Sequence, residues 1–541
     1  IIFNYEVLVR RAGMYTQLDY YMAILAIIIV LEGTRRVLGP ELPVISILFL
    51  IYARFGRIMP GMLAHRGYSW SRIASHMYFT TEGIFGIPLG VSATYIFLFL
   101  LLGAFAKRTG LGDLFIDLAM SLTGRTTGGP AKAAVVSSGL MGSISGSSVA
   151  NTVTTGSFTI PLMKRVGYDS QFAAAVEASA STGGQIMPPI MGAAAFIMAE
   201  FIGVPYVTIA KAAILPAILY YITVGLMVHF EAKKTGLQGM SPALIPKFMH
   251  VIKTRGHMIA PLIIIFYYLF RGYTPLRAAY LGIIVSFALS FLKKDTRMSL
   301  LDLRDTLKEG AISALGVAAA CAAVGFIVGV TTLTGLGLKF TSLTVALAQG
   351  NLFLALFFTM VACTILGTGL PTTATYIVLA TMAAPALTQL GVPILAAHLF
   401  VLYFGVVADL TPPAALAAYA GAGIAGSNPL KTGITAVKLA IAGFVVPFVF
   451  AYSPQMLLID TTWSQVLIIT GSAIIGVFSL AAAVLGYLNR KTTIIERLLL
   501  LGSSVALLFP GVYSDILGIA ILALVIFLQY RDKLTNNPQA A

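Results

Sequence analysis

Two stretches of small polar residues carry the candidates for chemistry in this sequence of 541 residues. Residues 142–151 are rich in glycine and serine, and residues 367–373 are rich in glycine and threonine. Each stretch is followed along the chain by a segment interrupted by two prolines, at 183–189 and at 409–413. Hydroxyl and carbonyl oxygens suit a small hard cation, and unpaired backbone N–H groups suit a carboxylate. The four segments therefore predict a binding site for a cation and an organic anion.

The candidate binding residues come from both members of each pair. In the first half of the chain they are Ser145, Gly146, Ser147, Ser148, Asn151, Gly183, Gly184 and Gln185. In the second half they are Gly367, Thr368, Gly369, Thr372, Thr373, Asp409 and Thr411. The pairs Pro188-Pro189 and Pro412-Pro413 cannot continue a regular helix, so each predicts a helix break. The alternative is that these small residues serve only close helix packing.

The composition places these stretches inside a membrane protein. The chain is 58% hydrophobic and 10% charged, whereas soluble domains carry about 25% charged residues. Many apolar runs are long enough to cross hydrocarbon as helices. The net charge of +15 lies largely in short loops between these runs, which is typical of residues that orient membrane spans rather than bind nucleic acid. We expect an all-α polytopic protein in a lipid bilayer, with neither an ATPase domain nor an enzymatic active site.

Two acidic residues fall within the interrupted segments. A carboxylate at membrane depth is costly and is a functional candidate by default. Asp409 lies beside the second proline pair, and we predict that it binds an ion or takes part in gating. Glu177 precedes the first break and is a candidate proton carrier. The alternative for Glu177 is a buried acid that is hydrogen-bonded to hydroxyl groups.

The pattern of apolar runs predicts two cores, each with a helical hairpin followed by a broken helix. The first core is residues 131–230, with its hairpin at 131–165 and its broken helix at 170–203. The second core is residues 311–455, with its hairpin at 351–390 and its broken helix at 393–424.

The remaining residues are predicted to form a scaffold around the cores. Residues 1–60 hold two candidate spans, and residues 61–130 hold a connection, a span and an amphipathic arm. Residues 231–310 hold two spans between basic loops, which we expect at 233–255 and 293–308. Residues 456–541 add further spans.

A constant offset relates the two cores. Adding 224 to a position in the first core places Pro161 on Pro385, Gly167 on Gly391, Pro188-Pro189 on Pro412-Pro413 and Pro205 on Pro429. Basic residues flank the base of the first hairpin, whereas Lys339 is the one cation near the second. Because basic residues favour the cytoplasmic side, the two hairpins enter from opposite faces. This pattern predicts two inverted repeats around a midplane site, the layout of secondary transporters.

Three motifs resemble the large membrane subunit of tripartite ATP-independent periplasmic (TRAP) transporters. They are residues 142–151, residues 160–168 and residues 183–189, within a resemblance that covers about 85–455. Residues 1–60 resemble a fused remnant of the small membrane subunit. The extra spans after residue 455 and the Gly183-Gly184-Gln185 motif are most similar to fused permeases of the TAXI-type branch.

The resemblance implies an elevator-type secondary transporter in the bacterial inner membrane. It also implies a periplasmic substrate-binding protein as partner, an organic acid as substrate, no cofactor, and sodium at the two sites formed by a hairpin tip and a helix break. Gln185 and the buried Glu177 depart from the family pattern, and the proton is the alternative coupling ion. A stand-alone dicarboxylate or citrate carrier is the alternative function, and a channel is a further one.

Overall fold

The computed structural model describes residues 5–536, except residues 12 and 510. Across these residues the secondary structure is helical apart from one isolated bridge between Tyr487 and Lys491. Within the described part of the chain, six helices are long and apolar enough to cross a membrane: Ile87–Arg108, Tyr206–Thr235, Leu300–Thr334, Pro429–Tyr452, Trp463–Leu485 and Val512–Arg531. The prediction of an all-α polytopic protein is confirmed.

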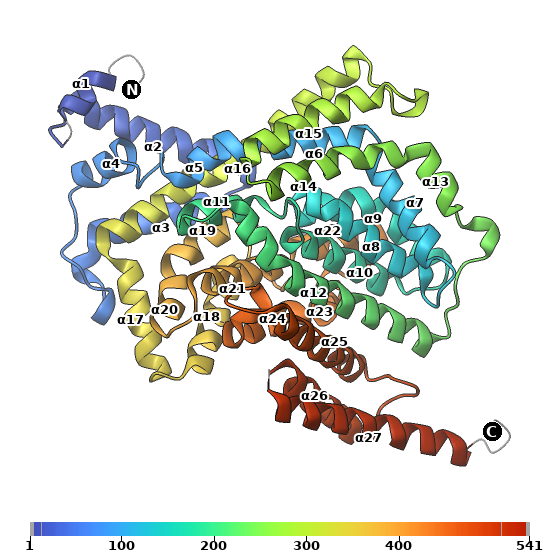
Figure 1. Ribbon diagram of the computed structural model, residues 1–541. Coiled ribbons are helices and arrows are strands. Elements are labelled where there is room, and N and C mark those ends of the chain that lie inside the picture. The colour runs from blue at the N-terminus through green and yellow to red at the C-terminus, as the bar shows by residue number, and fades with distance from the viewer. Residues whose placement is uncertain (1–4, 12, 510, 537–541) are drawn as a thin grey trace.

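The N-terminal helices pack along one long central helix (Figure 1). They are α2 (Gln17–Leu38) and α3 (Glu41–Phe55), and the central helix is α16 (Leu300–Thr334). Thr34 Oγ1 donates to the carbonyl of Ala319 at 3.2 Å, and Ser46 Oγ donates to that of Ala323 at 3.2 Å. Both candidate spans expected in residues 1–60 are therefore helices, although neither is among the six long apolar ones.

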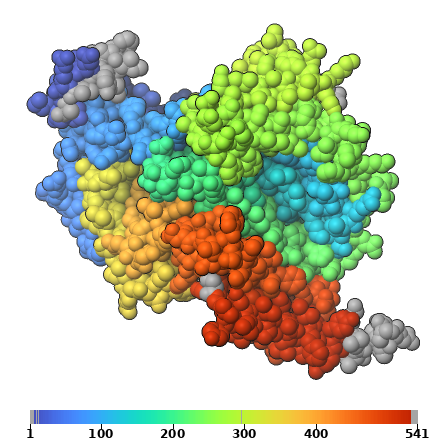
Figure 2. All heavy atoms as spheres, in the orientation of Figure 1, coloured from blue at the N-terminus to red at the C-terminus, as the bar shows by residue number. Residues whose placement is uncertain are grey.

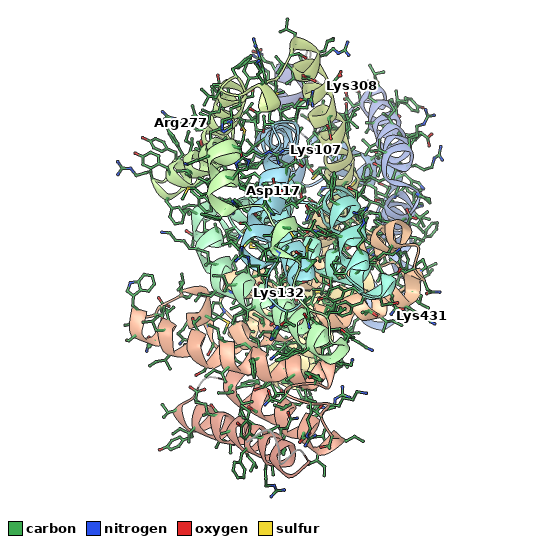
Figure 3. The ribbon with its side chains drawn as sticks, turned by 90° about the vertical axis from the view of Figure 1, so that its right-hand side faces the viewer. Lys107, Asp117, Lys132, Arg277, Lys308 and Lys431 are labelled. Carbon is green, nitrogen blue, oxygen red and sulfur yellow. The ribbon has the colours of Figure 1, made fainter. Side chains whose placement is uncertain are left out.

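A third helix, α6 (Phe97–Arg108), also packs along α16. Lys107, labelled in Figure 3, forms an ion pair with Glu309 of α16 at 2.6 Å. Arg108 forms a second ion pair with Asp302, also on α16. Two ion pairs therefore join the C-terminal end of α6 to the N-terminal part of α16.

Both basic loops expected around residues 231–310 are shorter than predicted. The prediction is wrong for residues 300–308, because α16 begins at Leu300 with a capping box between Ser299 and Asp302. It is also wrong for part of 233–255, where α12 (Tyr206–Thr235) ends and α13 (Phe248–Arg255) begins. Between these loops lie α14 (Ala260–Phe270) and α15 (Pro275–Ser290), which pack against each other.

Each core contains a hairpin and a broken helix, and an arm helix precedes each hairpin. The arm of the first half was predicted within the scaffold, but it packs on the first hairpin and is therefore grouped with the first core. In the first core these are α7 (Leu111–Thr123), the hairpin α8 (Gly129–Ser145) and α9 (Ser148–Arg165), and the broken helix α10 (Ser170–Gly183), η5 (Gly184–Ile186) and α11 (Ala193–Ile202). In the second core they are α17 (Leu336–Ala348), the hairpin α18 (Leu352–Gly367), α19 (Thr372–Met382) and α20 (Ala384–Gln389), and the broken helix α21 (Ile394–Val407), η9 (Ala408–Leu410) and α22 (Leu416–Ala425).

The broken helices cross between the two cores. Helix α10 packs on its own hairpin, α8 and α9, whereas its continuation α11 packs on α19 of the other hairpin. In the same way α21 packs on α18 and α19, and its continuation α22 packs on α9. The two breaks therefore lie between the two hairpins, in the middle of the molecule (Figure 1).

The C-terminal helices form a separate layer at the lower edge of Figure 1. Helices α25 (Trp463–Leu485), α26 (Ile494–Leu508) and α27 (Val512–Asn536) pack in sequence on one another. Helix α25 joins them to the cores through α12, and the layer protrudes in the space-filling view (Figure 2). Along the chain, α23 (Pro429–Leu439) and α24 (Ala442–Tyr452) follow the second broken helix and precede this layer.

Candidate functional site

The first hairpin turns over only two residues. Helix α8 continues to Ser145, and Gly146 caps it at a φ of +65°, a left-handed conformation that favours glycine. The Gly146 N–H donates to the Gly142 carbonyl at 3.0 Å. Ser147 then caps α9, since its Oγ accepts from the Ala150 N–H at 3.3 Å. The glycine and serine residues of this stretch thus mainly end one helix and begin the next.

The second hairpin has a longer turn, from Thr368 to Pro371. Gly369 adopts a φ of +82°, and Pro371 precedes the first residue of α19, Thr372. Thr368 directs its hydroxyl back to the carbonyl of Ile365 at 2.7 Å. Both α9 and α19 therefore start at a hairpin tip, where their first N–H groups lack partners within the helix.

The two helix breaks have the same form. Each helix ends in a short 3-10 turn, η5 or η9, followed by Pro188-Pro189 or Pro412-Pro413. Both proline–proline bonds are cis. The chain folds back after each turn: the Gly192 N–H donates to the Gln185 carbonyl at 2.9 Å, and the Ala415 N–H donates to the Thr411 carbonyl at 3.2 Å.

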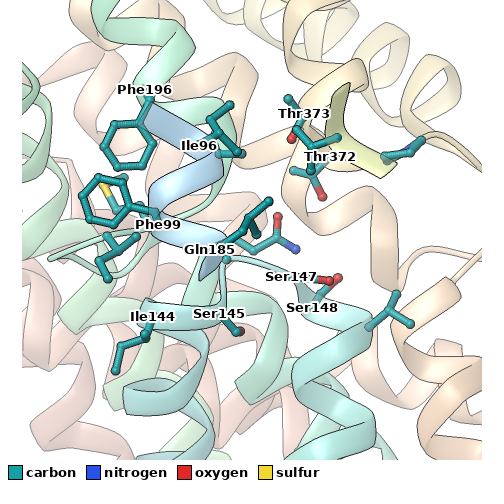
Figure 4. A pocket seen from close by; sticks show the side chains of 18 of the residues that line it. Ile96, Phe99, Ile144, Ser145, Ser147, Ser148, Gln185, Phe196, Thr372 and Thr373 are labelled. Carbon is teal, nitrogen blue, oxygen red and sulfur yellow. The ribbon is translucent and has the colours of Figure 1, made fainter. Parts of the chain in front are cut away.

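Both tips and both breaks meet at one cavity of about 250 Å³ (Figure 4). Eight of the candidate residues line it: Ser145, Gly146, Ser147, Ser148, Gln185, Thr372, Thr373 and Asp409. The opposite wall is apolar and includes Phe99 and Phe196, whose rings stack at a centroid distance of 4.6 Å. The cavity therefore has a polar wall from the cores and an apolar wall that includes α6.

Asp409 is the acidic residue of this cavity and accepts three hydrogen bonds. Ser148 Oγ donates to Asp409 Oδ2 at 2.6 Å, Thr372 Oγ1 at 2.9 Å and Gln185 Nε2 at 3.2 Å. Ser148 and Thr372 are the first residues of α9 and α19. The carboxylate therefore lies at the positive ends of two helices that belong to different cores, where a negative charge is favoured.

These partners are related by the sequence offset between the two cores. Adding 224 takes Ser148 to Thr372 and Gln185 to Asp409. The hydrogen bond from Gln185 to Asp409 thus joins two equivalent positions, one from each core. The contact lies between the two cores, because Gln185 belongs to the first and Asp409 to the second. At this central position the first core supplies a neutral amide and the second supplies the charge.

Several oxygens at the cavity have no protein donor. Among the described residues no hydrogen bond reaches Asp409 Oδ1, and Gln185 Oε1 and Ser145 Oγ are buried without a partner. Carboxylate, amide and hydroxyl oxygens are the ligand types of hard cations. The chemistry of this set of oxygens fits a bound alkali cation.

Asn151 is a candidate residue that the structure places away from this cavity. Its amide donates to the Ser138 carbonyl at 2.9 Å and to Ser181 Oγ at 3.0 Å, while Asn151 Oδ1 is buried without a partner. It lines a second cavity of about 360 Å³, which extends to Lys107 and Glu309. The two cavities share the lining residues Leu100, Ser145, Ser147, Val317, Pro371 and Thr373.

Of the other candidates, Gly183, Gly184 and Gly367 lie at contacts between helices, whereas Thr368 and Gly369 lie in the turn of the second hairpin. A Cβ on Gly367 would lie 2.8 Å from Ala408 Cβ, and a side chain on Gly183 would meet the Tyr220 ring. Gly184 contacts Gly142, where α8 crosses the break. Thr411 directs its hydroxyl to the Val407 carbonyl at 3.0 Å. The contacts of Gly183, Gly184 and Gly367 match the alternative interpretation, in which small residues serve close helix packing.

We expect Gly142→Val to destabilise the first core. A Cβ at residue 142 would lie 2.9 Å from Gly184 Cα, so the side chain would force α8 and the break apart at a cost of about 1–3 kcal/mol. The melting temperature of the purified protein should fall. The control is Gly471→Val on α25, where a Cβ has no atom within 4 Å. Equal melting temperatures for the two variants would show that this crossing is not tightly packed.

Glu177 is fully buried in a cluster of hydroxyl groups. Ser138, Thr155, Thr159 and Ser181 all donate to its carboxylate, with Thr159 at 2.5 Å and Ser181 at 3.2 Å. This arrangement matches the alternative interpretation of Glu177, a buried acid that is hydrogen-bonded to hydroxyl groups rather than a proton carrier. The sequence reasoning missed the four hydroxyl residues. Asn151, Thr155 and Thr159 are spaced four apart on α9, and this polar stripe was the available signal.

Comparisons with known proteins match this architecture to a transporter family. Residues 25–464 match the "Tripartite ATP-independent periplasmic transporter, DctM component". A putative TRAP transporter large permease protein of Haemophilus influenzae is 26% identical over 377 residues, which cover 68% of this chain and 86% of that protein.

Two further relatives match over shorter regions. The C4-dicarboxylate TRAP transporter large permease protein DctM of Pseudomonas aeruginosa is 28% identical over 206 residues, or 37% of this chain and 47% of that protein. The 2,3-diketo-L-gulonate TRAP transporter large permease protein YiaN of Escherichia coli is 28% identical over 152 residues, or 28% of this chain and 35% of that protein. The family match extends over most of the chain and includes both hairpins and both breaks. The chain therefore belongs to the DctM family of tripartite ATP-independent periplasmic transporters, and it is a multi-pass membrane transporter rather than an enzyme.

Proposed function

We propose that this protein is an ion-coupled importer of an organic acid in the bacterial inner membrane, and that it works with a periplasmic substrate-binding protein. The observation that carries the proposal is the meeting of both hairpin tips and both breaks at one cavity around Asp409. Secondary transporters build their sites in this way, from broken helices of two repeats.

Sodium is the proposed coupling ion, with the proton as the alternative. Asp409 supplies a negative charge, and Gln185 Oε1 and Ser145 Oγ supply neutral oxygens without donors. Small hard cations favour such oxygen ligands. The arrangement around Glu177 gives less support to proton coupling, because that carboxylate is enclosed by four hydroxyl groups and lines neither cavity.

The proposed substrate is an anion that carries a carboxylate. The first turns of α9 and α19 line the cavity through Ser148 and Thr372, and helix N-termini favour anions. The names of two relatives cite a dicarboxylate and a diketo sugar acid. Both are organic acids, which supports this substrate class for the present chain.

The proposed mechanism is an elevator movement of the two cores against a scaffold. Hairpin α8–α9 packs on α10 and α22 within the cores, whereas α2, α3 and α6 pack on α16. Helix α16 is therefore assigned to the scaffold, although residues 311–334 fall in the segment predicted for the second core. The first cavity lies at the boundary, between the polar tips and the apolar side chains of α6. Helices α2 and α3 fit the proposed role of a fused small subunit, because they extend the surface formed by α16.

Uptake by the purified protein in proteoliposomes tests this proposal. Labelled succinate and a labelled sugar acid are offered in turn with the cognate periplasmic protein, while Na⁺ and H⁺ gradients are imposed separately. We expect uptake of one of them to require both the inward Na⁺ gradient and the periplasmic protein. Uptake that is unchanged without the periplasmic protein would instead identify a stand-alone carrier. Uptake driven by the H⁺ gradient alone would exclude sodium coupling.

A further inference from the structure

A large apolar groove lies apart from the transport site. It has a volume of about 920 Å³ and runs between α7, α8, α12 and α14, with the break at Met187, Pro188 and Pro189 forming part of its wall. Most of its lining is apolar and includes Phe115, Leu118, Ile222 and Phe266. It shares no lining residue with either cavity at the hairpin tips.

The groove also has a basic site. Lys132 of α8, labelled in Figure 3, and His229 of α12 both line it. Lys132 Nζ lies 3.1 Å from His229 Nδ1 and 3.2 Å from Thr126 Oγ1. An ammonium group can only donate, so His229 accepts at Nδ1 and is neutral. Lys132 has three N–H donors, and these two contacts leave one of them for a ligand.

The positive charge of Lys132 is not neutralised by the protein. Among the described residues no carboxylate forms an ion pair with Lys132; the nearby Glu231 pairs instead with Lys234 at 3.0 Å. Lys233 adds a second positive charge close enough to act electrostatically on both Lys132 and His229. A cation beside an apolar groove is therefore complemented by a ligand with an anionic head and a hydrocarbon tail.

We propose that this groove binds an anionic phospholipid, with its phosphate at Lys132 and an acyl chain along α8 and α12. Basic pockets between membrane helices recognise anionic lipid headgroups in this way. The substrate is a poor alternative occupant, because a small organic acid could not cover the apolar walls. The lipid contacts the wall formed by Pro188 and Pro189, so it lies directly behind the break that holds Gln185.

Two variants test the headgroup and the acyl chain separately. Lys132→Ala removes the charge. Gly225→Leu fills the groove, because Gly225 lines it and a Cβ there has no atom within 4 Å. The matched controls are Lys431→Ala at an exposed lysine of α23, and Gly502→Leu at an exposed glycine of α26 whose Cβ also has no atom within 4 Å.

The measurement is native mass spectrometry of the full chain after purification from vesicles of equal phosphatidylglycerol and phosphatidylcholine. We expect the wild type and both controls to retain one phosphatidylglycerol, and both groove variants to retain roughly tenfold less, which corresponds to about 1.4 kcal/mol. An unchanged melting temperature confirms that the variants are folded. Equal retention in Lys132→Ala, or equal retention of phosphatidylcholine by the wild type, would overturn recognition of the anionic head. Equal retention in Gly225→Leu would overturn the placement of the chain.

Discussion

Asp409→Asn is expected to abolish coupled uptake and to leave the protein folded. The substitution keeps the shape of the side chain but removes the charge that accepts from Ser148, Thr372 and Gln185. Removing one partner of a buried, hydrogen-bonded charge pair costs about 2–5 kcal/mol, which corresponds to roughly 30-fold to several-thousand-fold in ion affinity. Initial rates of uptake at a fixed Na⁺ gradient, and the Na⁺ concentration for half-maximal uptake, measure this effect.

The matched control for this variant is Asp305→Asn. Asp305 is exposed on α16 and pairs with its neighbour Arg304 at 2.9 Å. It therefore tests the loss of one carboxylate away from the cavity, and uptake should be unchanged. If Asp409→Asn transported at the wild-type rate with the same Na⁺ dependence, the carboxylate would hold the two hairpins together without binding the ion.

Glu177→Ala is expected to destabilise the first core more than any other substitution considered. Thr155 and Thr159 keep backbone acceptors at 2.8 and 3.1 Å, and Ser138 keeps Thr155 Oγ1 at 2.7 Å as an acceptor, but Ser181 loses the carboxylate. A buried hydroxyl without an acceptor costs roughly 1–3 kcal/mol, and the cavity left by the deleted side chain adds a cost of about 2–5 kcal/mol. The melting temperature should fall sharply, whereas Glu200→Ala, at an exposed carboxylate of α11, should leave it nearly unchanged.

Glu177→Gln separates the structural role from proton transfer. Glutamine keeps one carbonyl oxygen for the hydroxyl groups but cannot carry a proton between states. Retained uptake under a Na⁺ gradient, together with partial recovery of the melting temperature, would assign Glu177 to packing. Complete loss of uptake in a stable protein would make Glu177 a proton carrier and would contradict the structural role.

The sequence was sufficient to predict both hairpins and both breaks. Glycine, serine and paired prolines interrupt the apolar helices and free backbone N–H and C=O groups. In a bilayer these groups must be satisfied by protein or by a water-filled cavity. Residues 142–151 and 409–413 were therefore recognisable from the sequence. Asp409 was recognisable because charge is costly at that depth. The start of α16 was missed even though Ser299 and Asp302 form a capping box, because the basic residues around them suggested a loop.

The contacts of the site could not be predicted from sequence. The offset of 224 pairs Gln185 with Asp409, but only the crossing of the broken helices brings these two residues within hydrogen-bonding distance. The apolar wall at Phe99 and Phe196 carries no signal that separates it from other packed aromatic residues. Gly183 and Gly184 have the composition of a binding loop, yet their contacts with Tyr220 and Gly142 are those of close packing.

The most direct test of the central claim is the accessibility of a single cysteine at Ser145. This residue lines both cavities, and its hydroxyl has no hydrogen-bond partner in the protein. Because the hydroxyl is a proposed sodium ligand, uptake by the unlabelled cysteine variant is the reference for the effect of labelling. In a background with the buried Cys321 and Cys363 replaced by alanine, Ser145→Cys is treated with an impermeant thiol reagent from each side of the membrane. We predict that the cysteine is labelled from either side and that Na⁺ and substrate change the relative rates of labelling from the two sides. Uptake should be lost once the cysteine is labelled. Labelling from one side alone under every condition would contradict a transport site between the two hairpin tips.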